Sequence, residues 1–282
     1  MASKVVLITG ANTGIGFQIV RALCSSDQAY DIIVGGRSFS KAQDAISSAE
    51  KEFPSSRSKL FPIQVDIEDD DSIQRAFDEV QSQFGKLDAL VNNAGMYQTH
   101  RDRKSCSLTR TVGAQIDQQF AAGKLTERDM WNQSWNINTV GTQVMTSTFI
   151  PLLLQTPDPR LLFITSGTST LAGTSNLALP VNRHPPKGWP KSGLSVSAYR
   201  SAKCGMNMLM REWHRILKED GVKVWCISPG FLATGLGGNP EGLKKMGAGD
   251  PAVAGPFIRS VLEGHRDDDV GKVITKDGLQ AW

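Results

Sequence analysis

Tyr199 and Lys203 are the two side chains whose types and spacing could carry out proton transfer. A free tyrosine hydroxyl has a pKa of about 10, so it is a poor base near neutral pH. A lysine ammonium nearby favours the phenolate and would lower the pKa of the tyrosine. Residues four apart on a helix share one face, and the segment 197–217 has helical spacing and ends before Gly221. We therefore expect these two side chains to act together as an acid–base pair.

A glycine-rich turn near the N-terminus has the features of a dinucleotide-binding loop. Residues 9–16 read Thr-Gly-Ala-Asn-Thr-Gly-Ile-Gly and directly follow the apolar run 5–8. Glycines allow the backbone to approach a pyrophosphate, and the helix that follows presents N–H groups to it. The spacing T-G-x-x-x-G-x-G differs from the G-x-G-x-x-G of the common fingerprint. A turn without a nucleotide is the alternative interpretation.

The end of the second apolar run indicates which dinucleotide is bound. An acidic residue there would accept hydrogen bonds from the adenosine ribose and repel a 2′-phosphate. The sequence instead has Gly35-Gly36-Arg37-Ser38, where Arg37 offers a guanidinium fork for phosphate and Ser38 a hydroxyl donor. This pattern predicts NADP(H) rather than NAD(H). Arg37 as a solvated residue at a strand end is the alternative, and the neutral Asn12 and Thr13 add no second basic group.

Short apolar runs alternate with longer amphipathic stretches along the whole chain, which is typical of an α/β fold. The runs predict strands at 5–8, 31–34, 60–65, 87–91, 160–164, 222–227 and 272–275. Continuous apolar strands joined by helices predict a single doubly wound (Rossmann) parallel sheet of about seven strands, with helices on both faces. The ligand of such a sheet lies beyond the carboxyl ends of its strands.

One domain spanning 1–282 is expected, because no repeat or low-complexity linker divides the chain. Two segments, at about 96–124 and 171–196, are longer than ordinary connections. The second contains four prolines and cannot form a regular helix. Long loops at this edge of a sheet are commonly lids or pocket walls, and surface decoration is the alternative.

Composition excludes several classes of protein. A net charge of +3 spread along the chain gives no basis for a nucleic-acid partner. Four distant cysteines form no C-x-x-C pair, which argues against a zinc site or a disulfide scaffold and fits a reducing compartment. The longest apolar run, 149–154, is too short to span a bilayer, and the first residues leave no room for a signal peptide. We expect a cytoplasmic protein without a metal or a membrane partner.

The glycine turn and the Tyr199/Lys203 pair belong to a longer series of motifs that resembles the short-chain dehydrogenase/reductase family. Further motifs of that family follow in the expected order: Asp66 after the third strand, Asn92-Asn93-Ala94-Gly95 after the fourth, Asn138 in the next helix, Ser166 after the fifth strand, and Pro229-Gly230-Phe231-Leu232-Ala233-Thr234 near the end. The resemblance covers almost the whole chain.

The resemblance implies a set of cofactor-binding residues. In chain order they are Gly10, Asn12, Thr13, Gly14, Ile15, Gly16, Arg37, Ser38, Asp66, Ile67, Asn93, Ala94, Gly95, Tyr199, Lys203, Pro229, Gly230, Leu232 and Thr234. Asp66 and Ile67 would contact the adenine, residues 93–95 the adenosine ribose, and residues 229–234 the nicotinamide carboxamide. A helix cap at Asp66 and a simple turn at 229–230 are compatible with these roles.

The resemblance also assigns catalytic roles. Tyr199 would be the acid in reduction and the base in oxidation, and Lys203 would also hold the nicotinamide ribose. Ser166 would orient and polarise the substrate oxygen, with Thr165 and Ser169 as rivals for this role. Asn138 would hold a water of a proton relay. Its rival Asn136 does not have the spacing to Gly141 that the family's motif shows.

The long segment between Ser166 and Tyr199 departs from most members of the family. It is similar to the carbonyl-reductase branch, whose members carry a comparable insertion and end near a tryptophan, as Trp282 does here. In that branch the insertion covers a surface that other members use for assembly. The resemblance therefore favours a monomer, and a homodimer or tetramer stays possible.

Together these observations predict an NADP(H)-dependent oxidoreductase that transfers hydride between the nicotinamide and a small carbonyl or alcohol substrate. Tyr97, Trp189 and Phe231 are the predicted substrate residues, and a glycine-rich stretch after Thr234 is a predicted lid. Their apolar character favours a hydrophobic ketone or aldehyde. A non-redox enzyme on the same scaffold and a non-catalytic NADP(H)-sensing protein are the alternatives, and the complete Ser166, Tyr199 and Lys203 set argues against the second.

Overall fold

A central parallel sheet organises the computed structural model, which describes residues 3–95, 97–99, 110–112, 123–189, 191, 196–237 and 240–282. The strands are β1 (Lys4–Ile8), β2 (Tyr30–Gly36), β3 (Lys59–Gln64), β4 (Ala89–Asn92), β7 (Arg160–Ile164), β8 (Lys223–Ile227), β9 (Val273–Thr275) and β10 (Gly278–Leu279). Their spatial order is β10-β9-β8-β7-β4-β1-β2-β3. The first seven in the chain are mutually parallel, and β10 pairs antiparallel with β9 at one edge. The predicted doubly wound sheet is confirmed.

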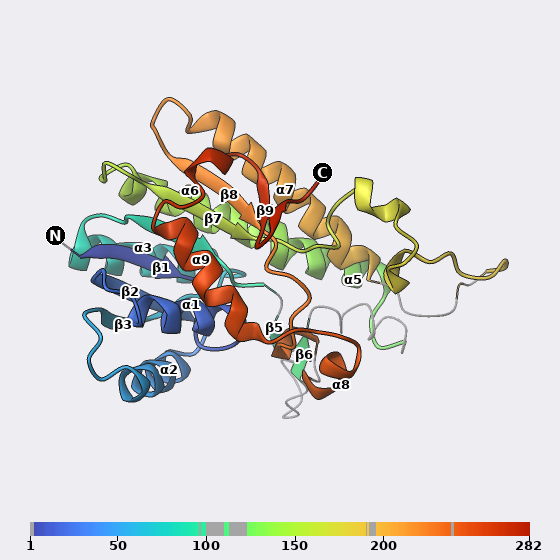
Figure 1. The fold of residues 1–282 in the computed structure, drawn as a ribbon, viewed down its shortest axis with the longest axis horizontal. Helices are drawn as coiled ribbons and strands as arrows, with labels where there is room; N and C mark the ends of the chain where they lie inside the picture. The colour runs from blue at the N-terminus through green and yellow to red at the C-terminus, as the bar shows by residue number, and fades with distance from the viewer. Residues whose placement is uncertain are drawn as a thin grey trace.

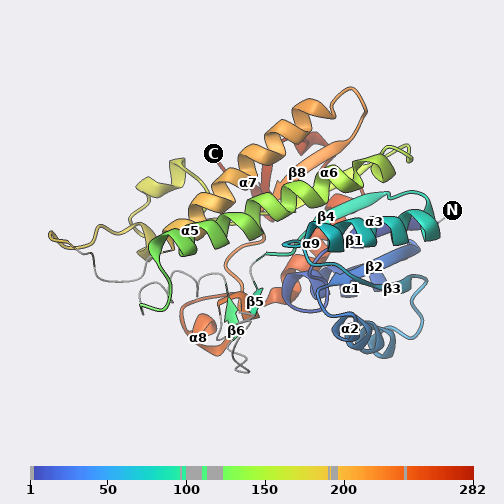
Figure 2. The ribbon, with the colours of Figure 1, turned by 180° about the vertical axis from the view of Figure 1, so that it is seen from behind.

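Helices cover both faces of this sheet. In Figure 1, α1 (Gly14–Cys24), α2 (Phe39–Glu52) and α9 (Ala254–Leu262) lie on the near face. Figure 2 shows α3 (Asp70–Phe84), α6 (Gly141–Leu153) and α7 (Ser197–Ile216) on the opposite face. The remaining helical elements are α5 (Glu127–Trp135), η1 (Asn136–Val140), η2 (Ala172–Ser175), η3 (Pro180–Asn182), η4 (Gly235–Gly237), α8 (Pro240–Lys245), η5 (Pro251–Val253) and η6 (Asp267–Asp269).

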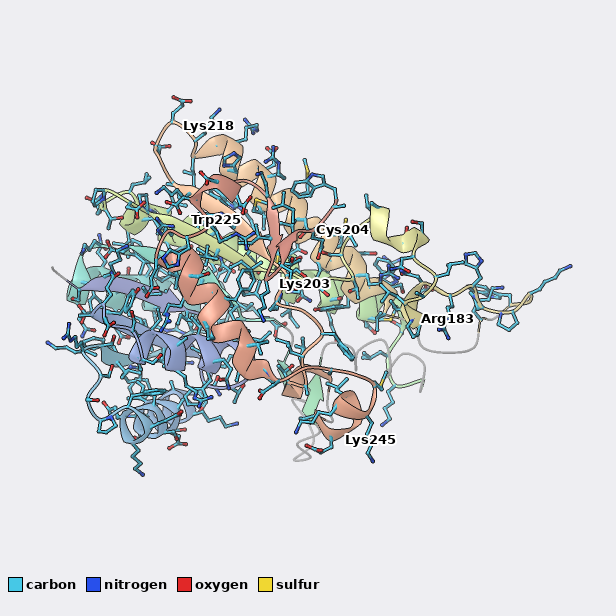
Figure 3. The ribbon with its side chains drawn as sticks, viewed as in Figure 1. Arg183, Lys203, Cys204, Lys218, Trp225 and Lys245 are labelled. Carbon is cyan, nitrogen blue, oxygen red and sulfur yellow. The ribbon has the colours of Figure 1, made fainter. Side chains whose placement is uncertain are left out.

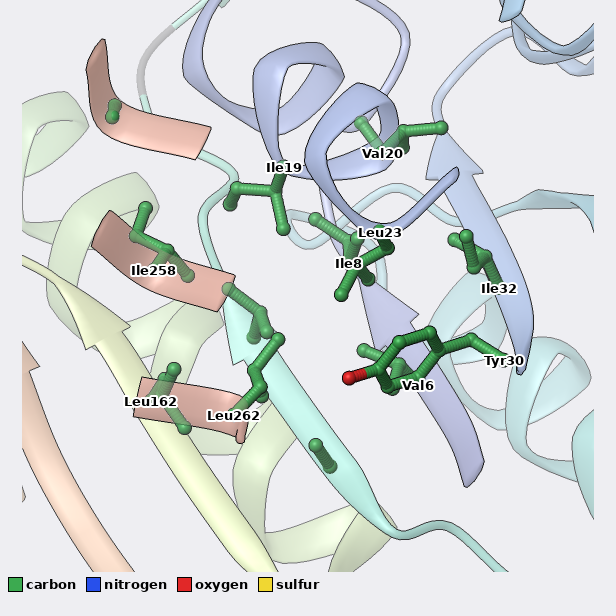
Figure 4. Packing of buried hydrophobic residues seen from close by; sticks show 14 of the residues in the cluster. Val6, Ile8, Ile19, Val20, Leu23, Tyr30, Ile32, Leu162, Ile258 and Leu262 are labelled. Atoms are coloured by element: carbon green, nitrogen blue, oxygen red, sulfur yellow. The ribbon is translucent and has the colours of Figure 1, made fainter. Parts of the chain in front are cut away.

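Alternate residues of each strand enter two hydrophobic cores, because successive side chains point to opposite faces of a sheet. Val6 and Ile8 of β1 pack with α1 and α9 in the core of Figure 4. Val5 and Leu7 of the same strand pack with α3, α6 and α7 in the second core. Burial on both faces explains why the strands read as continuous apolar runs.

The order of the strands reverses between β1 and β4, because β2 and β3 lie on one side of β1 while β7, β8 and β9 lie beyond β4. Parallel strands end at the same edge, so the loops that follow β1, β2, β4, β7 and β8 meet there. In open α/β sheets, ligands bind outside the carboxyl ends of the strands at such a reversal. The topology therefore brings residues 9–13, 93–95 and 165–171 together.

The two insertions lie near this edge of the sheet. The first contains a hairpin of β5 (Tyr97–Thr99) and β6 (Arg110–Val112), and β6 contacts η4, which leads to α8. Both views show the hairpin beside α8. The second insertion contains η2 and η3 and then extends away from the body of the molecule. The hairpin and β10 are elements that the sequence patterns did not predict.

Candidate active site

The glycine turn between β1 and α1 is closely packed. Gly10 and Gly14 have φ values of 63° and 56°, the left-handed region that favours glycine. A Cβ at Gly16 would overlap the carbonyl oxygen of Gly10 and lie 2.6 Å from Asn93 Nδ2. A side chain at Gly16 would therefore displace the turn. No side chain caps α1 at Thr13. The uncapped helix start and the close-packed turn fit a pyrophosphate.

Asn93 and Thr9 hold this turn against the end of β4. Asn93 Nδ2 donates to the carbonyl oxygens of Thr9 at 2.8 Å and Gly10 at 3.2 Å. Thr9 Oγ1 accepts hydrogen bonds from the backbone N–H groups of Asn93 at 3.0 Å and Ala94 at 2.8 Å. The amide of Asn93 thus supports the turn, and residues 93–95 lie beside it. Thr9 is a site residue that the predicted set lacked, although the T-G motif begins with it.

The end of β2 carries no acidic side chain. A Cβ at Gly36 would lie 3.2 Å from Asn12 Oδ1, so the turn and the end of β2 are in contact. Arg37 is partly buried and directly precedes Ser38. Ser38 caps α2, since its Oγ accepts from the N–H of Lys41 at 3.4 Å. This arrangement is compatible with a phosphate at Arg37, and it gives Ser38 a structural role as well.

Asp66 and Ile67 lie two and three residues beyond β3, next to the helices that carry the catalytic candidates. The backbone N–H of Asp66 donates to Ser72 Oγ at 3.0 Å, while Asp66 Oδ1 accepts from the N–H of Glu68 at 3.2 Å. Ile67 is buried, and a Cβ at Gly141 would overlap its carbonyl oxygen. Glycine at 141 lets α6 approach this segment.

Tyr199 and Lys203 lie one turn apart on α7, and Lys203 Nζ is 6.0 Å from the centroid of the Tyr199 ring. Lys203 is only 4% exposed, and its Nζ donates to the carbonyl oxygen of Ile164 at 2.9 Å, which fixes it at the end of β7. Figure 3 shows Lys203 near the middle of the molecule, where α7 crosses the sheet. The predicted proximity of the two side chains is found.

The pKa values differ from the expectation that Lys203 would make Tyr199 unusually acidic. Burial raises the pKa of Tyr199, and a hydrogen bond with Ser166 opposes this increase. Burial lowers the pKa of Lys203 to about 8. Desolvation disfavours the charged form of both groups, and at 6.0 Å the ammonium does not reverse this effect on the phenol. Without a cofactor, Tyr199 is therefore protonated at neutral pH.

Ser166 differs from its two rivals in its surroundings. Thr165 Oγ1 donates to Asn207 Oδ1 at 2.6 Å, and Asn207 Nδ2 donates to Ser169 Oγ at 3.0 Å. Both rivals are thereby held in a buried network with Asn207 below the loop. Ser166 is partly exposed and hydrogen bonds to Tyr199. It is the hydroxyl of the three that is placed to share a substrate oxygen with Tyr199.

Asn138 lies in η1, a π-helical turn between α5 and α6. Such turns are frequent at functional sites because they re-aim a side chain. Asn138 is fully buried, its Nδ2 donates to the carbonyl oxygen of Ser134 at 2.9 Å, and its Oδ1 has no hydrogen-bond partner among the residues that the structure describes. A Cβ at Gly95 would lie 3.4 Å from both Asn138 Oδ1 and Lys203 Nζ. The two polar atoms therefore converge above Gly95.

The rival Asn136 is exposed and donates to Glu68 Oε1 at 3.4 Å. It lies outside the group of side chains around Lys203. An unpaired buried acceptor is costly unless it has a partner. Asn138 Oδ1 thus marks the place where a water or a ligand hydroxyl would be stabilised.

The segment after β8 reaches back over the glycine turn. Gly230 has a φ of 99°, and the side chain of Thr234 lies 3.9 Å from the position of a Cβ at Gly14. Thr234 is 8% exposed, and Leu232 forms a β-bridge with Gly249. The segment 229–234 is therefore close enough to the turn for one dinucleotide to contact both.

Of the predicted substrate residues, the two whose side chains the structure describes are both exposed. Trp189 in the second insertion is 87% exposed, so the described structure does not pack it at the site. Phe231 is 54% exposed and belongs to the same segment, 229–234, as Thr234. The side chain of Tyr97 lies outside the described residues, and its backbone belongs to β5.

No helix in the described part of the chain is long and apolar enough to cross a membrane. Within the same residues, no group of three His, Cys, Asp or Glu side chains is arranged to hold a metal ion.

Comparison with known proteins identifies the family. Residues 4–178 and 190–241 match the family model for short chain dehydrogenases. The chain is 43% identical over 277 residues to the short-chain dehydrogenase/reductase tropE of Talaromyces stipitatus, covering 98% of this chain and 96% of that protein. It is 43% identical over 288 residues to the short-chain dehydrogenase/reductase eupG of Phoma sp, covering 99% and 97%.

The fold is similar to that of an NADPH-bound carbonyl reductase from chicken fatty liver, with a TM-score of 0.73 at 20% identity over the full length of both chains. This second likeness concerns the fold alone. Three observations indicate the same family: the sequence matches, the order of the motifs, and the convergence of Ser166, Tyr199 and Lys203. The chain belongs to the short-chain dehydrogenase/reductase family of oxidoreductases.

Proposed function

We propose that this protein is an NADP(H)-dependent reductase of a ketone or aldehyde, with Tyr199 as the proton donor. The observation that carries the proposal is the meeting of Ser166, Tyr199, Lys203 and Asn138 at the edge of the sheet where the glycine turn lies. Reduction of a carbonyl needs hydride at carbon and a proton at oxygen. Bound NADPH would supply the hydride.

The residues of the chain supply binding and the proton. The hydroxyls of Ser166 and Tyr199 would both donate to the substrate oxygen and stabilise the charge that develops on it. The raised pKa of Tyr199 keeps this phenol protonated, which is the form a proton donor needs. As the oxygen becomes an alkoxide, Tyr199 passes its proton to it.

Lys203 and Asn138 would restore the proton and hold the cofactor. The Lys203 ammonium, whose pKa is about 8, is charged at neutral pH and stabilises the phenolate left after transfer. Asn138 Oδ1 would accept from a water that links Lys203 to solvent. Nζ of Lys203 also lies where it could donate to the hydroxyls of the nicotinamide ribose.

The test is the oxidation of NADPH, followed by absorbance, against a panel of ketones and aldehydes. We expect Tyr199→Phe to lower kcat by at least about a hundredfold, since general acid catalysis typically contributes that much or more. Binding of NADPH should be nearly unchanged, which separates a lost proton donor from a lost cofactor site. A variant that keeps the full wild-type rate would refute Tyr199 as the donor.

Preference for NADP(H) over NAD(H) rests on Arg37 and on the absence of an acid at the described end of β2. Arg37→Asp should reverse the preference, because a carboxylate repels the 2′-phosphate and accepts from the free ribose hydroxyls of NAD(H). Titration of both cofactors with wild type and variant measures this. Tighter binding of NADH than NADPH by the wild type would contradict the assignment.

A non-redox reaction on the same scaffold is the second candidate, because bound dinucleotide and an acid–base pair could serve it too. It predicts that substrate is converted without a change in NADPH absorbance, which chromatographic analysis of the products in the same reactions would detect. We also propose a monomer. The long insertion before Tyr199 supports this proposal, because in the carbonyl-reductase branch a comparable insertion covers a surface that other members use for assembly. The exposed Trp135, Val140 and Met208 on α5, η1 and α7 are the apolar side chains that a homodimer would bury, and they favour the alternative. Light scattering of the purified protein measures its mass in solution and so distinguishes a monomer from a dimer.

A further inference from the structure

Arg200, the residue after Tyr199, joins two parts of the chain that are separate in the sequence. Its Nε donates to the carbonyl oxygen of Thr168 at 3.0 Å. Its Nη1 donates to the carbonyl oxygen of Val181 at 3.2 Å, and its Nη2 to Asn182 Oδ1 at 2.8 Å. Each of the three guanidinium nitrogens donates a hydrogen bond, and the side chain is partly buried. This is more than a solvated surface arginine requires.

The first acceptor belongs to the loop that carries the catalytic serine. Thr168 donates from its backbone N–H to Ser166 Oγ at 3.2 Å, and its Oγ1 is 3.0 Å from the same atom. Movement of the Thr168 carbonyl would therefore move the hydroxyl of Ser166. Arg200 fixes that carbonyl from the helix that also carries Tyr199.

The other two acceptors belong to the segment 172–183, which contains η2 and η3. Neither 3-10 helix has a buried residue, so no hydrophobic core holds the segment in place. Its shape depends on polar contacts: Asn182 Nδ2 donates to the carbonyl oxygens of Gly173 at 2.8 Å and Asn176 at 2.9 Å. Arg200 Nη2 donates to Oδ1 of the same asparagine. Arg200 thus joins this segment to α7.

We infer that Arg200 is a positioning residue that locks segment 172–183 as a wall of the substrate pocket and aligns Ser166 with Tyr199. The inference rests on the proposed reductase function. A guanidinium suits the task because its planar fork can donate to three fixed acceptors at once, whereas a lysine ammonium is a point charge on a flexible stem. Arg183, the last residue of this segment, donates from Nε to the carbonyl oxygen of Leu177 at 3.4 Å, and Figure 3 shows it toward the outer part of the insertion, away from Lys203.

The segment also indicates which substrates depend on this wall. Leu177 and Leu179 are 48% and 44% exposed, and the neighbouring Leu171 is 67% exposed. Apolar side chains left in contact with water gain most from an apolar ligand. A bulky hydrophobic ketone should therefore need the locked segment, and a small aldehyde that reaches only Ser166 and Tyr199 should need it less.

The experiment compares Arg200→Met and Arg200→Lys with Arg215→Met, a control on the same helix whose guanidinium pairs only with the exposed Glu212 among the described residues. Amide hydrogen exchange of peptides from 172–183 is measured first, in the absence of substrate. We expect faster exchange in both Arg200 variants and no change in the control. The lysine variant keeps the charge, so its failure to protect the segment would show that the fork is needed.

Kinetics with a bulky aryl ketone and a small aliphatic aldehyde form the second measurement. For Arg200→Met we expect kcat to fall for both substrates, because Ser166 is no longer aligned with Tyr199. KM for the ketone should rise about tenfold and KM for the aldehyde should change less than about threefold, while NADPH binding stays the same. Asn182→Ala should raise the same KM, and the double variant should cost less than the sum of the two single changes, because both of them remove the hydrogen bond between Arg200 and Asn182.

Unchanged exchange of 172–183 in both Arg200 variants would overturn the inference, and so would equal changes in KM for the ketone and the aldehyde. Failure of the proposed function is a different result: the wild type would not oxidise NADPH with any carbonyl compound, or Tyr199→Phe would remain fully active. The exchange measurement needs no turnover, so it tests the role of Arg200 even in that case.

Discussion

Lys203 shows how a residue proposed to act in catalysis can lower the stability of the fold. Its ammonium is 4% exposed, and burial lowers its pKa from the ordinary 10.5 to about 8. Below pH 8 the group is charged in both folded and unfolded states, so the folded protein bears the full cost of burying the charge. Between pH 8 and 10.5 the unfolded chain binds a proton that the folded chain does not, and stability rises with pH through this window.

We therefore predict that Lys203→Met is inactive and more stable than the wild type at pH 7, by about 2 kcal/mol. The advantage should shrink as the pH approaches 10.5. Denaturant unfolding at both pH values measures it, with the exposed Lys245→Met as the control. A variant that is less stable at pH 7 would mean that the lost hydrogen bond to the Ile164 carbonyl outweighs the relief of desolvation.

Among the elements, the C-terminal segment after β10 is a second support of the serine loop. Gln280 Nε2 donates to the carbonyl oxygen of Ser166 at 3.2 Å. The carbonyl oxygen of Trp282 accepts from the N–H of Ala172 at 2.7 Å and from Thr170 Oγ1 at 3.1 Å. Nothing in the sequence near residue 280 indicates this role, because the contact spans more than one hundred residues.

We predict that Gln280→Ala lowers kcat/KM for a carbonyl substrate about fivefold, the value of one hydrogen bond of about 1 kcal/mol. The effect stays small because Ser169 Oγ still donates to the same carbonyl at 2.6 Å. Steady-state kinetics and NADPH titration measure it, and the half-exposed Leu279→Ala is the control. A loss of NADPH affinity of the same size would show that the residue supports the cofactor site instead.

At the scale of the whole molecule, an ion-pair network holds the sheet at the edge opposite the site. Arg160 is 3% exposed at the start of β7 and contacts Asp158 at 2.8 Å and Asp267 at 2.7 Å. Lys223 contacts both aspartates at 2.7 and 2.6 Å. The Arg160 guanidinium also lies 5.6 Å from the centroid of a ring of Trp225. The network joins β7, β8 and η6.

We predict that Arg160→Met destabilises the protein by about 3 kcal/mol at pH 7, because it leaves two partly buried carboxylates with fewer partners. Burial alone would raise the pKa of Asp158 and of Asp267, but hydrogen bonds from Arg160 and Lys223 lower it below the ordinary 3.8. Their stabilising contribution is therefore present above pH 4 and is lost as the pH falls below it.

Chemical unfolding at pH 7 and at pH 3.5 tests this prediction. The difference between wild type and Arg160→Met should be smaller at the lower pH. Arg215→Met, which removes an exposed pair, should have no measurable effect on stability. An equal difference at both pH values would mean that Arg160 acts through packing on Trp225 rather than through its charge.

The pattern of apolar residues in the sequence was sufficient to predict the layers of this fold. Apart from β3, which lies at an edge and is only partly buried, the parallel strands are buried on both faces, so they are continuous apolar runs that the sequence displays directly. The antiparallel β10 and the β5–β6 hairpin were not predicted, because they are two or three residues long and lie at an edge or outside the main sheet. Short elements of this kind are defined by their partners rather than by their own pattern.

The order of the motifs also determined the family and the identity of the paired side chains, since local chemistry requires glycine at the turn and one helical turn between Tyr199 and Lys203. Only the tertiary structure decided the environment of these groups. It raised the pKa of Tyr199 instead of lowering it, separated Ser166 from Thr165 and Ser169, and left Trp189 exposed to solvent. Desolvation and hydrogen bonding depend on which distant segments pack around a group, and a linear sequence does not state that directly.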